Sequence, residues 1–492
     1  MDNLLTSEQM RMVDAYTIQH QPISSIDLME CAAQKFVKVF KEIFPDKSQS
    51  IGVYCGQGNN GGDGLAIARL LQEDKYQNIS VYLINFATKE SKDYTENLRR
   101  LSTTKIKPLV ITHPALVDGI VAEVIIDAIL GSGLNKPLTG KYAALAQEIN
   151  GLKKTVVAVD VPTGFPSEGV IDKNYRGIKA NLVISFQLPK LNFFFPESVL
   201  ALDQYRVVKI GLDKTFIADQ PSQWKLITKP CIRPRNQFTH KGTYGHALIV
   251  AGNTNTMGAA LLCAQACLRT GAGLTTLCLP QSGLVALNST LPEVMALPMD
   301  KGLSIGDFEK YTAFAIGPGM GSEEKAEQLL EQVIAGNQPI VIDADALSLL
   351  AKRNDLFDRL PEQTILTPHM KEFDRLFGVH QTWWERVETA QKQARARKLV
   401  IVLKNQYTFV CLSNGEVHVN ETGNAGMASG GMGDVLTGMI VGFLAQSYAS
   451  ADAAKLAVYV HGKAGDELAK KRFTVSASQV AQQIPKTIKR IR

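Results

Sequence analysis

Short apolar runs alternate with amphipathic stretches along most of this 492-residue chain, and the alternation is interrupted once, at residues 217–235. Such alternation is typical of parallel β-sheets covered by helices. In the interruption the periodicity fades and three prolines occur, as in a linker. The chain is also too long for one ordinary core, because domains average roughly 150 residues. We therefore expect two α/β domains, at residues 1–218 and 236–492, with a linker at 219–235.

The expected elements are short strands separated by helices. In the first domain the strands are Ile51–Cys55, Ile79–Ile84, Val124–Asp127, Val156–Asp160, Leu182–Phe186 and Val207–Ile210, with a helix from about Asp63. In the second domain the strands are Ala247–Ala251, Leu274–Leu279, Ala313–Ile316, Ile340–Asp343, Leu399–Leu403 and Tyr407–Cys411. The helices expected there are Met257–Thr270, Glu323–Ala335, Gly430–Leu444 and Ala451–Lys470.

Composition narrows the class of protein. Hydrophobic residues make up 45% of the chain and charged residues 20%, as in soluble globular proteins. The net charge of +6 is small for this length, so no nucleic-acid partner is expected. No signal peptide and no apolar run of about eighteen residues is found, which predicts a cytoplasmic protein without a membrane partner. The seven cysteines form no CxxC pair, so neither a disulfide framework nor a zinc ribbon is expected.

A glycine-rich loop joins the first expected strand to the first expected helix. Residues 56–64 read Gly-Gln-Gly-Asn-Asn-Gly-Gly-Asp-Gly. Glycines let a backbone approach a ligand closely, and a helix N-terminus offers N–H groups to phosphate. The spacing satisfies the dinucleotide fingerprint GxGxxG, but residues 81–86 have no carboxylate to hold a ribose, which disfavours a hydride-transferring Rossmann site. A tight turn without a ligand is the alternative.

Two further expected strands of this domain end in aspartate, at Asp127 and Asp160. The carboxyl ends of parallel strands form the edge of a sheet where ligands bind. Asn60, Asp127 and Thr163 offer an oxygen-only ligand set, which suits a hard cation such as potassium. Asp160 lies outside this set and is expected to be free for acid–base catalysis. The alternative is that each aspartate only caps the turn after it.

Three motifs of the first domain, at residues 57–64, 131–137 and 160–164, resemble those of the NAD(P)H-hydrate epimerase family, and the resemblance extends over about residues 1–215. It implies a Rossmann-like, three-layer α/β/α fold that interconverts the R and S forms of NADH or NADPH hydrated at carbon 6 of the nicotinamide ring. The implied potassium ligands are Asn60, Asp127 and Thr163. The implied substrate-binding residues are Asn59, Asn60, Gly61, Gly62, Asp63, Gly131, Ser132, Gly133, Leu134, Asn135, Lys136, Pro137 and Asp160, with Asp160 as the catalytic residue.

A second glycine-rich segment opens a helix of the second domain. Residues 423–438 read Gly-Asn-Ala-Gly-Met-Ala-Ser-Gly-Gly-Met-Gly-Asp-Val-Leu-Thr-Gly. Successive N–H groups of such a turn can surround an anion, with Asp434 at the rim. This combination suits phosphoryl transfer to a hydroxyl, because the amides neutralise charge while the aspartate accepts the hydroxyl proton. A bare helix cap is the alternative.

Other expected strand ends of this domain carry supporting residues. Gly317–Gly321 is another loop for close approach, and Asp343–Leu347 places two carboxylates after a buried strand. His369 ends a further strand, where we expect ligand contact, although a core histidine is the alternative. Lys404 lies in a turn between two strands, where it either meets a phosphate or is a solvated turn residue.

This set resembles the ADP- or ATP-dependent NAD(P)H-hydrate dehydratases, a branch of the ribokinase-like fold, from about His240 to Gly462. The resemblance implies a ribokinase-like α/β domain that uses ADP as co-substrate with Mg²⁺. The implied contacts to the hydrated cofactor are Ala259, Gly319, His369 and Asp434, with Asp434 catalytic. The implied contacts to the adenine nucleotide are Lys404, Asn405, Gln406, Tyr407, Thr408 and Gly433. One departure is visible: the family often has Pro-Gly-Glu after the histidine, where this chain has Met370-Lys371-Glu372.

The two resemblances together imply a bifunctional cofactor-repair enzyme. Its expected small-molecule partners are hydrated NADH and NADPH (NADHX and NADPHX) and ADP, and a homo-oligomer is expected. The main alternative is a vitamin-type kinase of the ribokinase-like fold joined to a nucleotide-binding domain, because a GxGD loop occurs in many such kinases. A non-enzymatic alternative is a nucleotide-sensing scaffold with inactive sites.

Overall fold

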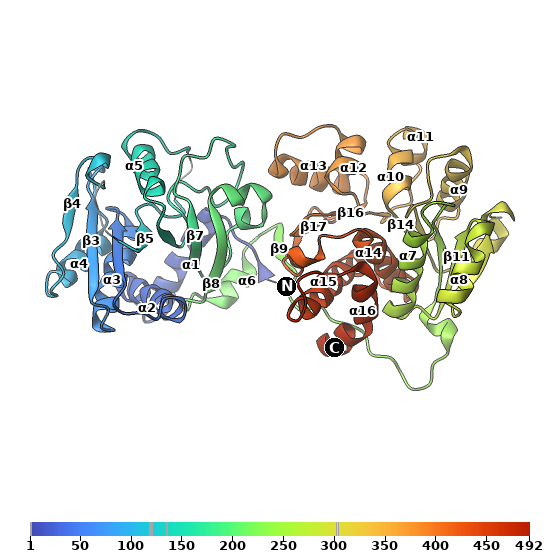
Figure 1. Cartoon of the computed structure of the whole chain (residues 1–492), viewed down its shortest axis with the longest axis horizontal. Helices are drawn as coiled ribbons and strands as arrows, with labels where there is room; N and C mark the ends of the chain where they lie inside the picture. The colour runs from blue at the N-terminus through green and yellow to red at the C-terminus, as the bar shows by residue number, and fades with distance from the viewer. Residues whose placement is uncertain (1, 118–121, 134–135, 302, 304) are drawn as a thin grey trace. The chain divides into compact units, whose positions relative to one another are not determined.

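The computed structural model describes residues 2–117, 122–133, 136–301, 303 and 305–492, and the chain divides into two compact units (Figure 1). Asn3–Ser222 form the N-terminal domain, and Gln223–Arg492 together with Asp2 form the C-terminal domain. The expected linker contains a strand, β9 (Trp224–Leu226), which pairs with β18 (Val417–Asn420) in the C-terminal sheet. Three residues are too few for a periodic pattern to reveal, which is why the sequence did not indicate this strand.

The N-terminal domain is built on a parallel sheet with the strand order β4-β3-β2-β5-β6-β7-β8. Its strands are β2 (Ser50–Cys55), β3 (Asn78–Ile84), β4 (Leu109–Ile111), β5 (Val124–Ala128), β6 (Thr155–Val159), β7 (Ala180–Phe186) and β8 (Leu202–Val208). Successive strands run from β2 outward to β4 and then from β5 outward to β8. The order therefore reverses between β2 and β5, and ligands bind such sheets beside this reversal, at the carboxyl ends of the strands.

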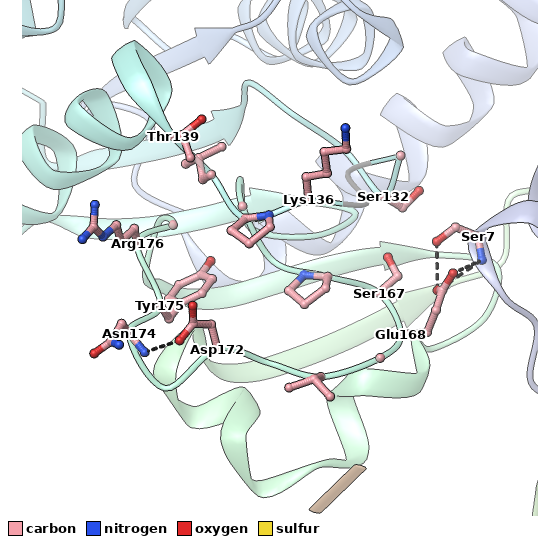
Figure 2. A pocket seen from close by; sticks show the side chains of 18 of the residues that line it. Ser7, Ser132, Lys136, Thr139, Ser167, Glu168, Asp172, Asn174, Tyr175 and Arg176 are labelled. Carbon is pink, nitrogen blue, oxygen red and sulfur yellow. Dashed lines mark hydrogen bonds between the residues drawn. The ribbon is translucent and has the colours of Figure 1, made fainter. Parts of the chain in front are cut away.

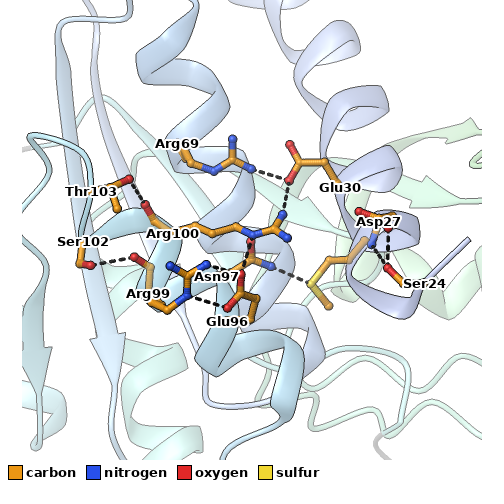
Figure 3. A network of polar contacts seen from close by, with 11 residues as sticks. Ser24, Asp27, Glu30, Arg69, Glu96, Asn97, Arg99, Arg100, Ser102 and Thr103 are labelled. Atoms are coloured by element: carbon orange, nitrogen blue, oxygen red, sulfur yellow. Dashed lines mark hydrogen bonds and ion pairs between the residues drawn. The ribbon is translucent and has the colours of Figure 1, made fainter.

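Helices cover both faces of this sheet. They are α1 (Ser7–His20), α2 (Ser25–Ile43), α3 (Asn59–Glu73), α4 (Lys92–Leu101), α5 (Gly140–Gly151) and α6 (Lys214–Asp219). One core contains side chains of α2, α3 and α4, and the core on the other face contains those of α5. A polar network also joins α2, α3 and α4 (Figure 3): Glu30 of α2 pairs with Arg69 of α3 and, at 3.6 Å, with Arg100 of α4. These contacts hold α3, and with it the glycine-rich turn, between α2 and α4.

Most of the expected N-terminal strands agree with the structure within two residues. The last expected strand, Val207–Ile210, was wrong in extent, because β8 covers Leu202–Val208. In the first half of β8, one buried leucine is followed by two exposed polar residues, as suits an edge strand, so this half lacks an apolar run.

The helix expected from Asp63 begins four residues earlier, at Asn59, so the second half of the expected loop is the first turn of α3. The glycines allow this early start because the turn packs very closely. A Cβ on Gly61 would lie 1.6 Å from the carbonyl oxygen of Gly56, and one on Gly64 would lie 2.5 Å from the Cβ of Ala128. At these two positions packing alone requires glycine, whether or not a ligand is bound.

The C-terminal sheet has the strand order β1-β9-β18-β17-β16-β15-β14-β13-β10-β11-β12. Neighbours from β16 to β12 are parallel, while β17 is antiparallel to β16 and β18. In chain order the strands are β1 (Asp2–Asn3), β9, β10 (His246–Val250), β11 (Leu274–Leu279), β12 (Met295–Pro298), β13 (Ala313–Ile316), β14 (Ile340–Ile342), β15 (Ile365–Leu366), β16 (Val400–Leu403), β17 (Thr408–Cys411) and β18. Here the order reverses between β10 and β13. Both domains are therefore α/β folds on predominantly parallel sheets, as the sequence predicted.

Helices of the C-terminal domain bury apolar side chains against one face of the sheet. In chain order they are α7 (Met257–Thr270), α8 (Leu284–Thr290), α9 (Glu324–Ala335), α10 (Ala344–Leu350), α11 (Asn354–Phe357), α12 (Met370–Phe377), α13 (Trp383–Ala396), α14 (Met432–Ala445), α15 (Ser450–Ala469) and α16 (Ala477–Ile491). Helix α14 packs directly on α7: a Cβ on Gly438 would lie 2.1 Å from the carbonyl oxygen of Cys263. Within the described ranges, no helix is both long and apolar enough to cross a membrane.

Candidate active sites

A cavity of about 680 Å³ lies where the strand order of the N-terminal sheet reverses. It is lined by seven of the predicted substrate-binding residues: Asn59, Asn60, Asp63, Gly131, Ser132, Gly133 and Asp160. Helices α1 and α2 complete the wall with residues that include Arg11, Asp14 and Met29. Gly61 and Gly62 are buried within α3 and are not part of the lining, while Leu134 and Asn135 lie outside the described residues.

A second cavity, of about 660 Å³, adjoins the first at the loop after β5 (Figure 2). The two share Arg11, Ser132 and Gly133, and the second cavity also contains Lys136 and Pro137. One of its edges is fixed by a carboxylate that accepts hydrogen bonds at the start of α1: Glu168 Oε1 lies 3.1 Å from the backbone N of Ser7, and its Oε2 lies 3.0 Å from Ser7 Oγ. The predicted second loop therefore divides its residues between two neighbouring cavities.

Asp127, at the end of β5, is fully buried and is held by Thr163. Its Oδ1 accepts a hydrogen bond from Thr163 Oγ1 at 2.7 Å and its Oδ2 accepts one from Thr163 N at 2.7 Å. Ile129 N also donates to Oδ1 at 3.2 Å, so part of its role is to cap its own turn, as the alternative reading stated. Among the described residues Asp127 has no cationic partner, and burial raises its pKa to about 6.

Asn60 lies in the first turn of α3, which follows the strand beside β5, and its side chain is buried. A Cβ on Gly131 would lie 3.3 Å from the Cβ of Asn60, which places the amide against the loop after β5. Its Nδ2 has no hydrogen-bond partner in the part of the chain that the structure describes. Buried polar atoms are normally satisfied, so an unpartnered amide beside an uncompensated carboxylate indicates a place for a polar ligand or ion.

Asp160 follows β6 and forms a buried ion pair that the sequence did not indicate. Lys190 Nζ lies 2.7 Å from Asp160 Oδ1, and the two side chains are 7% and 14% exposed. Ser185 Oγ and Phe186 N also donate to Oδ1, at 3.1 and 3.0 Å, and Asp160 has a φ of 65°, which is unusual for a residue other than glycine. Asp160 is therefore not an isolated carboxylate, because Lys190 is paired with its Oδ1, but Oδ2 accepts no hydrogen bond from the described residues; its role in acid–base catalysis stays a prediction.

Two more carboxyl groups, Asp14 of α1 and Asp63 of α3, line the same cavity. Burial raises the pKa of Asp14 to about 6, with Lys190 opposing the shift and Asp160 adding to it. Burial, Asp160 and Asp14 raise the pKa of Asp63 well above its ordinary value. Sequence reasoning missed Asp14 and Lys190 because neither belongs to a motif and neither lies near Asp160 in the chain.

The second site is formed where α14 begins, at the GxGD loop. Gly431 precedes the helix with a φ of 89°, and Asp434 lies in the first helical turn. Burial raises the pKa of Asp434 to about 6; Asp343 adds to the rise and Lys404 opposes it. Asp343 is itself 2% exposed and accepts hydrogen bonds from Lys404 Nζ and Thr437 Oγ1, both at 2.7 Å. Lys404 is therefore not a solvated turn residue, because its ammonium is held at the site by a buried carboxylate.

A cavity of about 430 Å³ adjoins this loop. Of the predicted nucleotide contacts, it is lined by Lys404, Asn405, Gln406, Thr408 and Gly433, whereas Tyr407 is not part of the lining. The lining also includes Asn420, Thr422, Asn424 and His461, none of which was among the predicted contacts. The polar run after β18 is a signal that could have indicated the first three of these residues.

Two comparisons identify relatives of the whole chain. Residues 25–192 match the family model described as YjeF-related protein N-terminus, and residues 247–488 match the model described as NAD(P)H-hydrate dehydratase. The bifunctional NAD(P)H-hydrate repair enzyme of Moorella thermoacetica is 32% identical over 95% of this chain and 93% of its own length. The enzyme of the same name from Coxiella burnetii is 32% identical over 95% of each chain. The chain belongs to the bifunctional NAD(P)H-hydrate repair enzyme family.

The repair-enzyme family also accounts for the fold of the second domain. A solved ribokinase-like superfamily protein from Enterococcus faecalis is 32% identical, with a TM-score of 0.50, and the match covers 55% of this chain and 96% of that protein. The C-terminal domain is thus ribokinase-like, as predicted. Because the relatives match both domains, the repair-enzyme reading is favoured over a vitamin-type kinase joined to an unrelated nucleotide-binding domain.

Two predicted substrate contacts of the dehydratase half, Ala259 and Gly319, are both hydrogen-bonded to Thr256, the N-cap of α7. Thr256 Oγ1 donates a hydrogen bond to the carbonyl oxygen of Gly319 at 2.6 Å, and Ala259 lies three residues after Thr256. Gly319 has a φ of 60°, and its Cβ would lie 2.9 Å from the carbonyl oxygen of Thr256, so only glycine fits this contact.

His369, the third predicted contact, is the N-cap of α12. Its Nδ1 accepts hydrogen bonds from the backbone N of Lys371 and Glu372, at 3.1 and 3.2 Å, and Glu372 Oε2 accepts one from His369 N at 2.9 Å. The residues that depart from the family pattern, Met370 and Lys371, therefore start a helix after a complete capping box. The backbone of His369 pairs with Lys404, which brings it beside the Asp343–Lys404 pair.

Proposed function

We propose that the N-terminal domain interconverts the R and S forms of NADHX and NADPHX, and that the C-terminal domain dehydrates the S form with ADP. The observation that carries the proposal is a pair of separate carboxylate sites, each beside a glycine-rich turn that opens a helix. One is Asp160 with Lys190, in the cavity at the start of α3, and the other is Asp434 with Asp343 and Lys404, at the start of α14. Family membership supports the same assignment. The two activities complement each other, because a dehydratase that accepts one epimer needs a supply of it.

The proposed dehydration overcomes a poor leaving group. Asp434 accepts the proton of the C6 hydroxyl while the hydroxyl oxygen attacks the β-phosphate of ADP, which forms a phosphate ester and releases AMP. The lone pair of ring nitrogen N1 then expels phosphate from C6, and loss of a C5 proton restores the dihydropyridine. Backbone N–H groups at the start of α14, together with Lys404, are placed to neutralise charge on the transferred group.

We place the adenine nucleotide in the 430 Å³ cavity beside Gly433. Within the described residues, no group of three His, Cys, Asp or Glu side chains is arranged to hold a metal ion. Magnesium that enters with the nucleotide would therefore be held by the phosphates and at most one or two carboxylates such as Asp434, where it would neutralise phosphate charge. Steady-state turnover with ADP and with ATP, each with and without Mg²⁺, tests the choice of co-substrate and cation.

We place potassium between Asn60, Asp127 and Thr163. The fit rests on the buried carboxylate of Asp127, which has no cationic partner among the described residues, and on the buried side chain of Asn60, whose amide oxygen would be a ligand. Thr163 Oγ1 keeps one lone pair after its bonds to Asp127 and Leu130, so the set offers oxygen ligands and a single negative charge. Exchange of potassium for choline should lower the melting temperature and the affinity of the first domain for its substrate, and Asp127→Ala should remove this response.

The proposed substrate would occupy both N-terminal cavities. Asn59, Asn60 and Asp160 surround the first cavity, and the loop at Gly131–Gly133 opens into the second, so an extended dinucleotide could place its two halves on either side of this loop. The N–H groups at the start of α3 would then face its phosphates.

The deciding experiment separates the two activities. Purified protein is supplied with R-NADPHX or S-NADPHX, with or without ADP, and NADPH formation is followed together with the epimer ratio. We expect S-NADPHX to yield NADPH only with ADP, and R-NADPHX to change epimer without it. Phosphorylation of small alcohols in the absence of NADPH formation would favour the kinase alternative instead. The cytoplasmic location and the homo-oligomer stay predictions.

A further inference from the structure

One carboxyl group in the N-terminal cavity, Asp14, is left without a task by the proposed function. It projects from α1, outside every sequence motif, and it lines the same cavity as Asn59, Asp63 and Asp160. Among the described residues it forms no hydrogen bond and no ion pair, whereas Oδ1 of Asp160 accepts from Lys190 and two further donors. Of the four carboxyl groups in the described lining of the cavity, Asp14, Asp63, Asp93 and Asp160, Asp160 is paired with a cation, whereas Asp14 is unpaired.

The charged groups that line the cavity with Asp14 come from five parts of the domain. Arg11 lies one turn earlier on α1, Asp63 belongs to α3 and Asp93 to α4, and Asp160 and Lys190 follow β6 and β7. Burial, with a smaller contribution from Asp160, favours the protonated form of Asp14 and raises its pKa to about 6, against the opposing effect of Lys190. A carboxyl group whose protonated form is favoured by burial, beside a second carboxyl group paired with a lysine, is suited to act as a general acid in the same site.

We propose that Asp14 is a catalytic residue of the epimerase site, a general acid that works with Asp160 as general base on the hydrated nicotinamide ring. This inference rests on the proposed function. C6 of the substrate carries a hydroxyl and is bonded to N1, so inversion requires that one bond to C6 break and re-form. Asp160 takes the hydroxyl proton, C6 becomes a carbonyl as its bond to N1 breaks, and Asp14 protonates N1.

The return steps restore both residues. Rotation about the C5–C6 bond presents the other face of the carbonyl carbon to N1. Nitrogen attack then re-forms the C6–N1 bond, the N1 proton goes back to Asp14, and Asp160 returns its proton to the C6 oxygen. No oxidant, reductant or co-reactant is consumed, and the Lys190 ammonium remains paired with Asp160 throughout.

The test compares Asp14→Asn with the wild-type enzyme, using R-NADPHX without ADP across pH 5.5–8.5. We expect epimerisation at pH 6 to fall by roughly 10²–10⁴ in Asp14→Asn, the usual contribution of a general acid, with the uncatalysed rate subtracted. The wild-type rate should decline as the pH rises above about 6, because Asp14 then loses its proton, and this decline should be absent from the variant. Equilibrium binding of NADPH to the N-terminal domain should change less than threefold.

Controls distinguish the possible failures. Asp203→Asn makes the same chemical change on exposed β8 and should leave the rate and pH profile unchanged. Asp14→Ala should regain activity when formate is added, which a merely structural role would not allow. A wild-type rate and profile in Asp14→Asn, or Asp14→Ala that binds NADPH but is not rescued, would overturn the inference and leave the proposed function intact. A wild-type enzyme that fails to epimerise at all would overturn the proposed function.

Discussion

Both domains have a site beside a glycine-rich turn that opens a helix, but they arrange charge there in opposite ways. In the N-terminal domain Lys190 pairs with the motif aspartate itself, Asp160. In the C-terminal domain Lys404 pairs with Asp343, and the motif aspartate Asp434 keeps a pKa raised by burial. The first arrangement neutralises a carboxylate in the cavity, whereas the second holds an ammonium in place and leaves the nearby base unpaired. Similar loops at similar positions therefore do not imply similar roles for their charged residues.

The largest effects are expected when each motif carboxylate is removed in turn, which tests whether the two sites act independently. Asp434→Asn should slow ADP-dependent dehydration of S-NADPHX by roughly 10²–10⁴, because the general base is lost while shape is kept. Nucleotide affinity should change little. Asp160→Asn should abolish R-to-S conversion and leave dehydration of the S form intact. Single-turnover phosphate release and the epimer ratio measure the two effects, with Asp452→Asn, a change in a side chain that is 55% exposed, as control. Loss of both activities in one folded variant would contradict two independent sites.

The second largest effect is expected on stability, from the buried Lys404–Asp343 pair of the C-terminal domain. Lys404→Met should destabilise the domain by about 3 kcal/mol, because Asp343 is left buried without its cation. The double variant Lys404→Met/Asp343→Asn should recover most of this loss, because no charge is then left unpaired. Urea unfolding of the wild type, of Lys404→Met, of Asp343→Asn and of the double variant gives the coupling energy. Strict additivity would mean that Lys404 is not stabilised by Asp343.

Packing at the glycine turn of the N-terminal domain predicts a smaller effect. Gly61→Ala should cost about 1–3 kcal/mol, because its Cβ would lie 1.6 Å from the carbonyl oxygen of Gly56. Gly58→Ala is the matched control, since no atom lies within 4 Å of a Cβ there and its φ is −92°. Thermal unfolding of the two variants should differ by several degrees. Equal melting temperatures would show that α3 can shift without cost.

The smallest expected effect is a contrast in pH dependence between the two halves. Asp434 must be ionised to accept a proton, so with a pKa of about 6 the dehydration rate should rise about tenfold from pH 5 to the plateau above pH 7. The epimerase rate should change in the opposite direction over the upper part of this range, because Asp14 must be protonated. Pre-steady-state rates of dehydration and of epimerisation at each pH measure the two profiles. If both rates changed with pH in the same direction, the proposed difference in protonation between Asp434 and Asp14 would be contradicted.

The sequence by itself determined the motif residues and the two-domain α/β organisation. Aspartates at strand ends are local features, and a parallel sheet brings strand ends to one edge, so Asp127 and Asp160 could be predicted from their positions. Asp434 could be predicted from the glycine-rich turn that opens its helix. Residues of each predicted loop do line a cavity, namely Asn59 and Gly131 in one domain and Gly433 in the other. Their individual roles in binding stay predictions.

The partners of those residues were decided only by the tertiary structure. Lys190 meets Asp160 because β6 and β7 are neighbours, and Lys404 meets Asp343 although 61 residues separate them. Asp14 enters the cavity because α1 packs there, and nothing in its local sequence indicates a cavity. Charge, burial and pKa depend on neighbours in space, while a motif records only neighbours in the chain. The sequence therefore located the sites, and the fold decided which carboxylates are paired and which are left to carry a proton.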